Sequence, residues 1–302
     1  MGGETVNNAL WVYLDNDIDM NDLGFKVQIK QNGFNSDKFI VFDGQGHTIS
    51  NIYFNLGVDF SLFYRFSQVK NINFKDCLIL AKNIRFIDIC DPDWVGWSGG
   101  TRAQNISFTG ELYSNGYTYF CCGHNQYQNG SVDYSDIVFN GTVFSTAEFY
   151  FLMFYNDQPG TVNSCALIVR VISDTYYTAF LYTTNAAVNC KLCIFILKGY
   201  RRISTGESKL ALIHRSRTSY LTITNLIFVP LEQFVNVTDN LLIISGNNAQ
   251  NISGNVIYDL DKIQEYDMTI QTLSYDTLSV IGESSLNLKD PTYMHHTYGF
   301  PT

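Results

Sequence analysis

Carboxylate pairs are the side chains of this chain that could carry out acid–base chemistry. The segment DICDPDW holds Asp88, Asp91 and Asp93, and the segment VDYSD holds Asp133 and Asp136. Glycosidases place two carboxyl groups about 5 to 9.5 Å apart, and residues i and i+2 of a strand share a face about 7 Å apart. Nearly every acidic strand meets that condition. We therefore interpret these carboxylates as solvated turn residues and predict no catalytic residue.

Metal and redox motifs are incomplete. DNDIDMND resembles a calcium loop, but Met20 and Lys26 stand where an EF-hand requires Gly and Glu. Cys190 and Cys193 form a CxxC motif with no second pair for zinc. Residues three apart on a strand point to opposite faces, and we expect Cys165 and Cys190 to stack at neighbouring levels as buried thiols. The sequence predicts neither a metal nor a cofactor.

Two segments favour ligand binding over catalysis. One is DPDWVGWSGGTR, where aromatic rings in a Gly-rich loop suit stacking on a sugar or a protein contact. The other, residues 198–217, has six basic residues against Glu207, and could accept a sugar acid or an acidic surface such as the C-terminal third of this chain. The alternatives are a Trp packed over the fold and a solvated basic loop. The candidate ligand-binding residues are Trp94, Trp97, Arg201, Arg202, Arg215 and Arg217.

Composition limits the class of protein. Hydrophobic residues make up 46% of the 302 residues and charged residues 16%, so the chain can bury a large core. A net charge of -9 opposes binding to nucleic acid, which requires a positive surface. No apolar run reaches the roughly 18 residues of a membrane span, and MGGETVNNAL lacks the features of an export signal. We expect seven reduced cysteines and assembly in a cytoplasm.

A repeat must position these residues. Apolar anchors such as Phe120, Leu152, Phe180 and Leu212 recur at intervals of about 30 residues, and each interval holds two or three short alternating segments separated by turns. No helical segment lies between them. Such a unit cannot bury its apolar face alone, so the pattern predicts a solenoid in which each strand pairs in parallel with its equivalents in the next coils.

A polar residue recurs before an apolar–any–apolar triplet, as in NINF and NISF. Asn tolerates the left-handed backbone region and can bond its own backbone at a corner. Amides at one corner of successive coils can also form a ladder in which each donates to the next. The predicted structural corner consists of Asn51, Asn71, Asn83, Asn105, Asn189, Asn225 and Asn251.

The N-terminal part carries a resemblance to a known family. The segments LWVYLDNDIDMNDLGF, FIVFDGQGHTISNIYF and FSLFYRFSQVKNINF, within residues 10–74, resemble the GLUG-type repeats of right-handed parallel β-helix proteins. Ser61 replaces the family's Gly before LFY, and later coils keep only the rhythm of strand, turn and Asn. Such repeats occur in bacteriophage appendages and in surface adhesins of gut bacteria, so the resemblance implies the fold more firmly than the function.

We therefore predict one all-β domain, a right-handed parallel β-helix of about eight coils. Residues 1–50 would form the N-terminal cap and first coil, residues 51–260 the repeat coils, and residues 261–302 a C-terminal cap or docking segment, because the open ends of a solenoid must be covered.

The predicted function is a non-enzymatic virion structural or attachment protein, a bacteriophage fibre, spike or decoration subunit. Identical acidic rods commonly form trimers, so the expected partners are copies of the chain, other virion proteins and a host-surface glycan. The alternatives are a polysaccharide-degrading tailspike of the same fold, acting as a hydrolase or lyase, and a bacterial surface adhesin.

Overall fold

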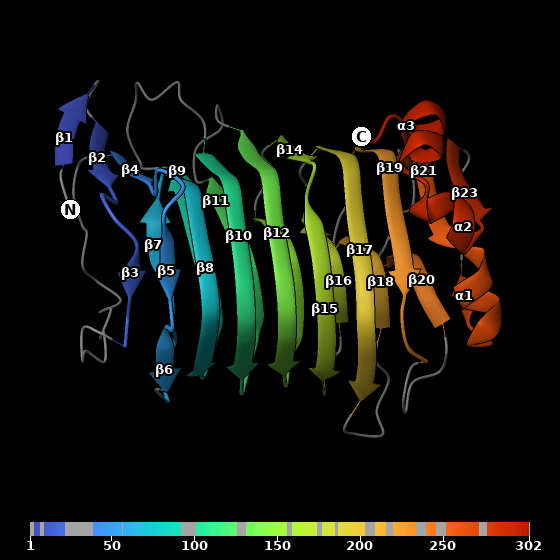
Figure 1. The fold of residues 1–302 in the computed structure, drawn as a ribbon, viewed down its shortest axis with the longest axis horizontal. Helices are drawn as coiled ribbons and strands as arrows, with labels where there is room; N and C mark the ends of the chain where they lie inside the picture. Colours follow the sequence, from blue (N-terminus) through green and yellow to red (C-terminus); the bar gives the residue numbers. More distant parts are fainter. Residues whose placement is uncertain are drawn as a thin grey trace.

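The structure is a computed structural model, and it describes residues 3–6, 9–21, 39–55, 57–91, 101–125, 131–155, 159–173, 177–184, 187–202, 209–215, 220–233, 240–245, 252–271 and 277–301. These residues form a mostly β, parallel β-solenoid of about six turns (Figure 1). The predicted fold class is confirmed. The sequence predicted about eight coils, and the structure has about six turns, because strands at the ends such as β7 and β22, of four and three residues, are short.

Two sheets form the walls of the solenoid. Sheet A has fifteen strands, and every pairing within it is parallel except the one between the first two. Its strands are β1 (Gly3–Val6), β2 (Ala9–Tyr13), β3 (Ile18–Asp19), β4 (Phe39–Asp43), β5 (Thr48–Ser50), β6 (Tyr53–Asn55), β8 (Gln68–Ala81), β10 (Thr101–Ser114), β12 (Val132–Ser145), β14 (Gly160–Asn163), β15 (Ala166–Ser173), β17 (Val188–Arg202), β19 (Leu221–Pro230), β21 (Ile252–Asp259) and β23 (Thr277–Glu283).

Sheet B lies behind sheet A in Figure 1 and has eight strands, all paired in parallel. They are β7 (Phe63–Phe66), β9 (Ile84–Asp91), β11 (Thr118–Asn125), β13 (Glu148–Tyr155), β16 (Tyr177–Thr183), β18 (Lys209–Arg215), β20 (Asn240–Ser245) and β22 (Thr269–Gln271). In the middle of the rod the chain alternates between the sheets, so each coil contributes one level to both.

At the first corner of each coil in sheet A, one residue has a left-handed backbone conformation. This residue interrupts the alternation of inward and outward side chains, so the set of residues that faces the core shifts by one position after it. In β10, for example, Ala103 and Ile106 both face the core although they are three apart, because Asn105 between them has φ of 51°. Two side chains three apart on a regular strand would point to opposite faces. The residues stacked at this corner, each with φ between 51° and 62°, are Asn71, Asn105, Asp136, Ser164, Leu192 and Asn225.

The predicted Asn ladder is present only in part of the chain. The side-chain amide of Asn105 donates to Oδ1 of Asn71 at 3.0 Å, and that of Asn71 donates to Oδ1 of Asp43 at 3.0 Å. Asn51 has φ of 58° and belongs to a second corner, where its amide donates to Asp19 at 2.9 Å. The amide of Asn71 is thus both donor and acceptor in this ladder, which satisfies polar groups that the corner would otherwise leave unpaired.

Two predicted corner residues lie elsewhere. Asn189 is inside β17, three residues before the left-handed Leu192 that takes the corner at that level. Asn83 lies in the turn between the sheets, where its amide donates to Asp59 at 2.8 Å and its Oδ1 accepts the backbone N–H of Tyr117. Asn251 lies outside the described residues.

The same backbone kink corrects the expectation for the CxxC motif. Cys190 and Cys193 both point into the core and are fully buried, because Leu192 turns the chain between them. The thiol of Cys193 contacts those of Cys190 and Cys165. Cys165 thus stacks on Cys193, whereas the register partner of Cys190 is Val162. All seven cysteines are buried, and none forms a disulfide.

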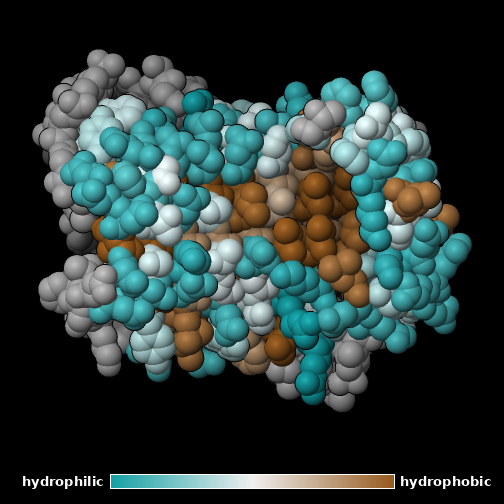
Figure 2. All heavy atoms as spheres, viewed as in Figure 1, coloured by the Kyte–Doolittle hydropathy of each residue, from teal (hydrophilic) through white to brown (hydrophobic). Residues whose placement is uncertain are grey.

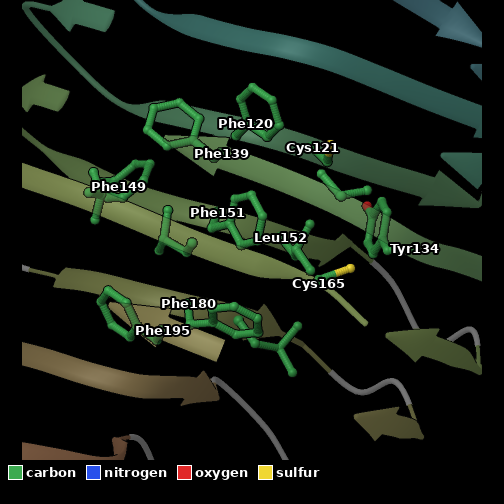
Figure 3. Packing of buried hydrophobic residues seen from close by; sticks show 14 of the residues in the cluster. Phe120, Cys121, Tyr134, Phe139, Phe149, Phe151, Leu152, Cys165, Phe180 and Phe195 are labelled. Atoms are coloured by element: carbon green, nitrogen blue, oxygen red, sulfur yellow. The ribbon is translucent and has the colours of Figure 1, made fainter. Parts of the chain in front are cut away.

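The core is a column of aromatic and aliphatic side chains between the sheets (Figure 3). On the sheet B side Phe86, Phe120, Phe151 and Phe180 follow one another at centroid distances of 5.3, 5.7 and 5.3 Å. Because these rings come from four consecutive levels, each ring buries the next. The column therefore joins the coils along the length of the rod.

Three helices cover the C-terminal end (Figure 1): α1 (Leu260–Glu265), α2 (Ser285–Lys289) and α3 (Pro291–Tyr298). The α1 helix begins at Asp259, whose carboxylate accepts the backbone N–H of Lys262, and α3 begins at Asp290 in the same way. Met294 and Phe300 pack on the outer face of sheet A against Ile227 and Ile257. Among the described residues no helix has the length and apolar character needed to cross a bilayer.

Candidate functional site

The outer face of sheet B gathers polar and aromatic side chains that could act together. Its strands bend so that two consecutive residues face the core. In β13, Phe151 and Leu152 point inward while Tyr150 and Met153 point outward. Parallel register then places equivalent outward residues in two rows that run along the rod. The rows are Arg85, Tyr119, Tyr150, Ala179 and Ala211, and Asp88, Cys122, Met153, Tyr182 and His214.

The tyrosines of this face stack on one another. Tyr119 lies 4.6 Å from Tyr117 and 5.4 Å from Tyr150, and Tyr150 lies 4.5 Å from Tyr182. The ring of His214 lies 4.0 Å from that of Tyr177, stacked against it. Tyr150 is 1% exposed. Each ring here has another ring against its face, so these faces stabilise the solenoid from outside and leave little flat surface for a sugar ring.

Asp88 is the unusual titratable group of this face. It is 1% exposed, and its Oδ2 lies 3.8 Å from Nη1 of Arg85. Burial raises the pKa of Asp88 to about 7, and the positive charges of Arg85 and Arg65 oppose that rise. A carboxyl group with a pKa near neutrality can hold or release a proton under ordinary conditions. The guanidinium of Arg85 also lies over the ring of Tyr117, at 5.3 Å from its centroid.

A second carboxylate on this face, Glu148, is engaged by a tyrosine. The hydroxyl of Tyr119 donates to Oε2 of Glu148 at 3.0 Å. Burial and the Glu148 charge raise the pKa of Tyr119 well above its ordinary value. The hydroxyl therefore stays protonated and acts as a donor. The face thus offers one acid with a pKa near neutrality, one tyrosine-bound carboxylate and one arginine.

The carboxylate pairs singled out in the sequence do not form a described catalytic pair. Asp133 accepts a hydrogen bond from the hydroxyl of Thr161 at 2.6 Å, and its other oxygen lies 3.8 Å from Arg102. Asp136 is the left-handed corner residue of its coil, with φ of 54°. The side chain of Asp91 and the whole of Asp93 lie outside the described residues. Asp88 is buried, whereas the sequence interpretation made it a solvated turn residue.

Among the described residues, no three His, Cys, Asp or Glu side chains form a group that could hold a metal ion. In the acidic segment DNDIDMND, Asp17 and Asp19 are engaged in local structure, and Asp22 lies outside the described residues. Asp17 accepts the backbone N–H of Thr48 at 2.9 Å and contacts Nδ1 of His47 at 3.1 Å, and Asp19 accepts the backbone N–H of Asn21 at 2.9 Å.

The structure describes only some of the predicted ligand-binding residues. Arg201 is exposed near the end of β17 in sheet A, next to Arg202. Arg215 ends β18 in sheet B, and the side chains of Arg202 and Arg215 are outside the described part. Trp94, Trp97 and Arg217 also lie outside it. Arg201 and Arg202 thus lie at the end of β17, whereas Arg215 lies at the far end of the next strand, β18, and no described contact brings these residues together.

The sequence analysis missed the tyrosine rows. Their signal is present as outward residues of the sheet B strands, one period apart, in TYFCCG, EFYFLMFY and YTAFLYT. Strict alternation would put half of these residues inside. Because two consecutive residues face the core in each strand, alternation alone does not identify the outward set.

The ladders, the interior column and the outer tyrosine rows define a parallel β-solenoid protein. No protein-family model matches the chain, and no curated protein matches it. Among solved structures, the chain is similar to a Bacteroides ovatus protein described as a "putative immunoglobulin A1 protease". The two share 16% identity with a TM-score of 0.41, over 95% of this chain and 81% of that chain.

Proposed function

We propose that the chain is a non-enzymatic structural or attachment subunit of a bacteriophage virion, in which the solenoid serves as a rigid spacer or receptor-binding rod. The observation that carries the proposal is the continuity of the rod. In the middle of the rod each level pairs in parallel with the next in both sheets, and the interior rings of Phe86, Phe120 and Phe151 stack from level to level. Bending or local opening would break ladder bonds and ring contacts together, which favours stiffness and resistance to proteases.

The cysteines favour assembly in a reducing compartment. All seven are buried, including Cys193, whose thiol contacts those of Cys165 and Cys190. Buried thiols of this kind suit a reducing compartment, where disulfides rarely form. A virion protein assembled in the host cytoplasm meets this condition. In this proposal the partners are identical copies in a trimer, other virion proteins and a host-surface glycan, with no role for nucleic acid or membrane insertion.

The relationship to GLUG-type repeats is part of the proposal. It depends on residues 10–74, where the family's sequence elements are most complete. A bacterial surface adhesin of the same fold would share these elements and is kept as an alternative.

A polysaccharide-degrading tailspike is the second candidate, and Asp88 favours it. Its buried carboxyl, with a pKa of about 7, could act as a general acid beside Arg85. Against it, the neighbouring Tyr119 and Tyr150 stack on each other, and Asp88 itself is 1% exposed.

A glycan array combined with product analysis tests the proposal. Purified protein is applied to bacterial surface polysaccharides, binding is scored, and the solution is analysed for released oligosaccharides. Binding without release supports the attachment role. Release that is lost in Asp88→Asn would overturn the non-enzymatic assignment. The genes next to the coding sequence separate the virion protein from the adhesin, because the virion proposal expects them to encode capsid or tail proteins.

A further inference from the structure

An apolar stripe runs along the outer face of sheet A. Parallel register aligns its first row as Val138, Ala166, Ile194, Ile227, Ile257 and Ile281, and a second row as Ile168, Ile196 and Val229. Toward the N-terminal end the first row continues with polar residues. The register partner of Val138 in β10 is Ser107, and the partner of Ser107 in β8 is Asn73. The apolar character therefore begins at β12.

The C-terminal helix α3 covers only half of this stripe. Met294 and Phe300 bury Ile227 to 6% and Ile257 to full burial. The other half is only partly shielded, and Val138 is 37% exposed. Figure 2 shows this half as hydrophobic residues gathered over the middle of sheet A, in a hollow between hydrophilic margins and beside the C-terminal helices. We call it the open stripe; it consists of Val138, Ala166, Ile168 and Ile196, and Ile194 forms its border with the cluster of Met294 and Phe300.

Basic side chains border the open stripe where β15 and β17 continue. Arg170 follows Ile168 by two residues and is exposed, with its guanidinium 2.6 Å from Glu232. Lys198 follows Ile196 by two residues and reaches across β15 to donate to Oδ1 of Asn140 at 2.6 Å. Arg201 is exposed further along the same strand. An occupant should therefore present an apolar side chain with acidic neighbours.

The C-terminal end of the chain has that chemistry. Leu286 on α2 is 79% exposed, the highest value among the exposed large hydrophobic side chains of the described residues. The elements around it are acidic. The carboxylate of Asp261 accepts the backbone N–H of Ser285 at 2.8 Å, and Glu265, Asp267 and Asp290 are exposed. The basic residues of this end are Lys262, paired with Glu265 at 2.6 Å, and Lys289.

We propose that the open stripe is the docking surface for a second copy of this chain, which inserts Leu286 and its acidic surroundings. The open stripe continues the apolar surface that α3 already covers, so it can bury the side chain of Leu286. The basic border of the stripe and the acidic surroundings of Leu286 carry opposite charges, which orient the partner. The two surfaces are different parts of the molecule, so the contact is heterologous and repeats around a ring or along a filament. The inference stands whether or not the chain belongs to a virion.

Sedimentation velocity of the full chain tests this contact. Wild-type protein at micromolar concentration is expected to form assemblies larger than a dimer. Val138→Asp removes the docking surface and Leu286→Asp removes the inserted residue, and each is expected to weaken association at least about tenfold. Both replaced residues are exposed, so the variants should fold, which circular dichroism and urea unfolding verify. Val58→Asp, at a 56% exposed position outside both surfaces, is the matched control.

Mixing the two variants gives the decisive result. Val138→Asp keeps its Leu286, and Leu286→Asp keeps its open stripe, so a mixture can form a single intact contact and should yield dimers that do not grow. Monomeric wild-type protein would overturn the inference. So would a mixture that remains monomeric, or variants that associate as strongly as Val58→Asp.

Discussion

Buried Asp88 makes the stability of the solenoid depend on pH. Burial raises the pKa of this carboxyl from 3.8 to about 7, and Arg85 opposes the rise only in part. The native state therefore binds the proton more tightly than the unfolded chain, and protonation stabilises the fold. The stabilisation is complete below about pH 4 and is lost as pH rises through about 7. A rise of this size corresponds to about 4 kcal/mol of unfolding free energy.

Urea unfolding of wild-type protein and of Asp88→Asn, at several pH values between about 4 and 8, measures this effect. Asparagine keeps the size of the side chain and cannot ionise, so the difference between the two proteins isolates Asp88 from other titrating groups. We expect the wild-type free energy of unfolding, relative to that of the variant, to fall by about 4 kcal/mol across this range. A difference that stays constant with pH would refute the reasoning. It would mean that Arg85 keeps the carboxylate ionised in the native state.

Four further predictions concern the coils. Gly110→Ala should lower the free energy of unfolding, measured in urea, by at least about 2 kcal/mol. The reason is that φ is 150° and the new Cβ would lie 2.2 Å from the backbone oxygen of Cys77. Gly57→Ala, where the new Cβ would meet open space, is the control and should change the free energy little. Asn105→Ala should lower the free energy of unfolding by about 1 to 2 kcal/mol. Asn105→Gly should lower it less, because glycine adopts the left-handed conformation easily and only the ladder hydrogen bond is lost. Equal losses in the two variants would contradict this reasoning. Phe120→Ala should cost about 3 to 5 kcal/mol at full burial, as measured by thermal and urea unfolding. A thiol reagent should label none of the seven cysteines in native protein and all of them in urea, and rapid native labelling would contradict their burial.

The sequence predicted the kind of fold well because the same pattern of apolar residues recurs in successive coils. One period of about 30 residues, with alternating segments and no helical spacing, recurs along most of the chain, so a mistake in one coil does not change the conclusion. Individual positions were less certain. Asn189 fitted the corner pattern, yet Leu192 takes the left-handed conformation. Leucine is unfavourable there, and the stacking of this coil between Ser164 and Asn225 overrides that preference.

The candidate site could not be predicted from the sequence, because its properties depend on contacts between coils. The spacing of acids in DICDPDW is met by nearly every acidic strand, so the sequence favoured a solvated turn residue at Asp88. Its environment instead comes from other coils, with Cys122 next to it in the register and Tyr117 over Arg85. Desolvation depends on neighbours that are distant in the sequence, so a raised pKa cannot be seen in a local pattern.

The amino-acid sequence by itself determined the period, the parallel stacking of equivalent segments and the burial of the cysteines, since these follow from which side chains must leave water. Only the tertiary structure decided where each strand bends, which residues face outward on sheet B, and that α3 covers half of an apolar stripe and leaves the rest open. Those features depend on the register between coils and on the path of the C-terminal segment. Both are set by contacts between residues that are far apart in the chain.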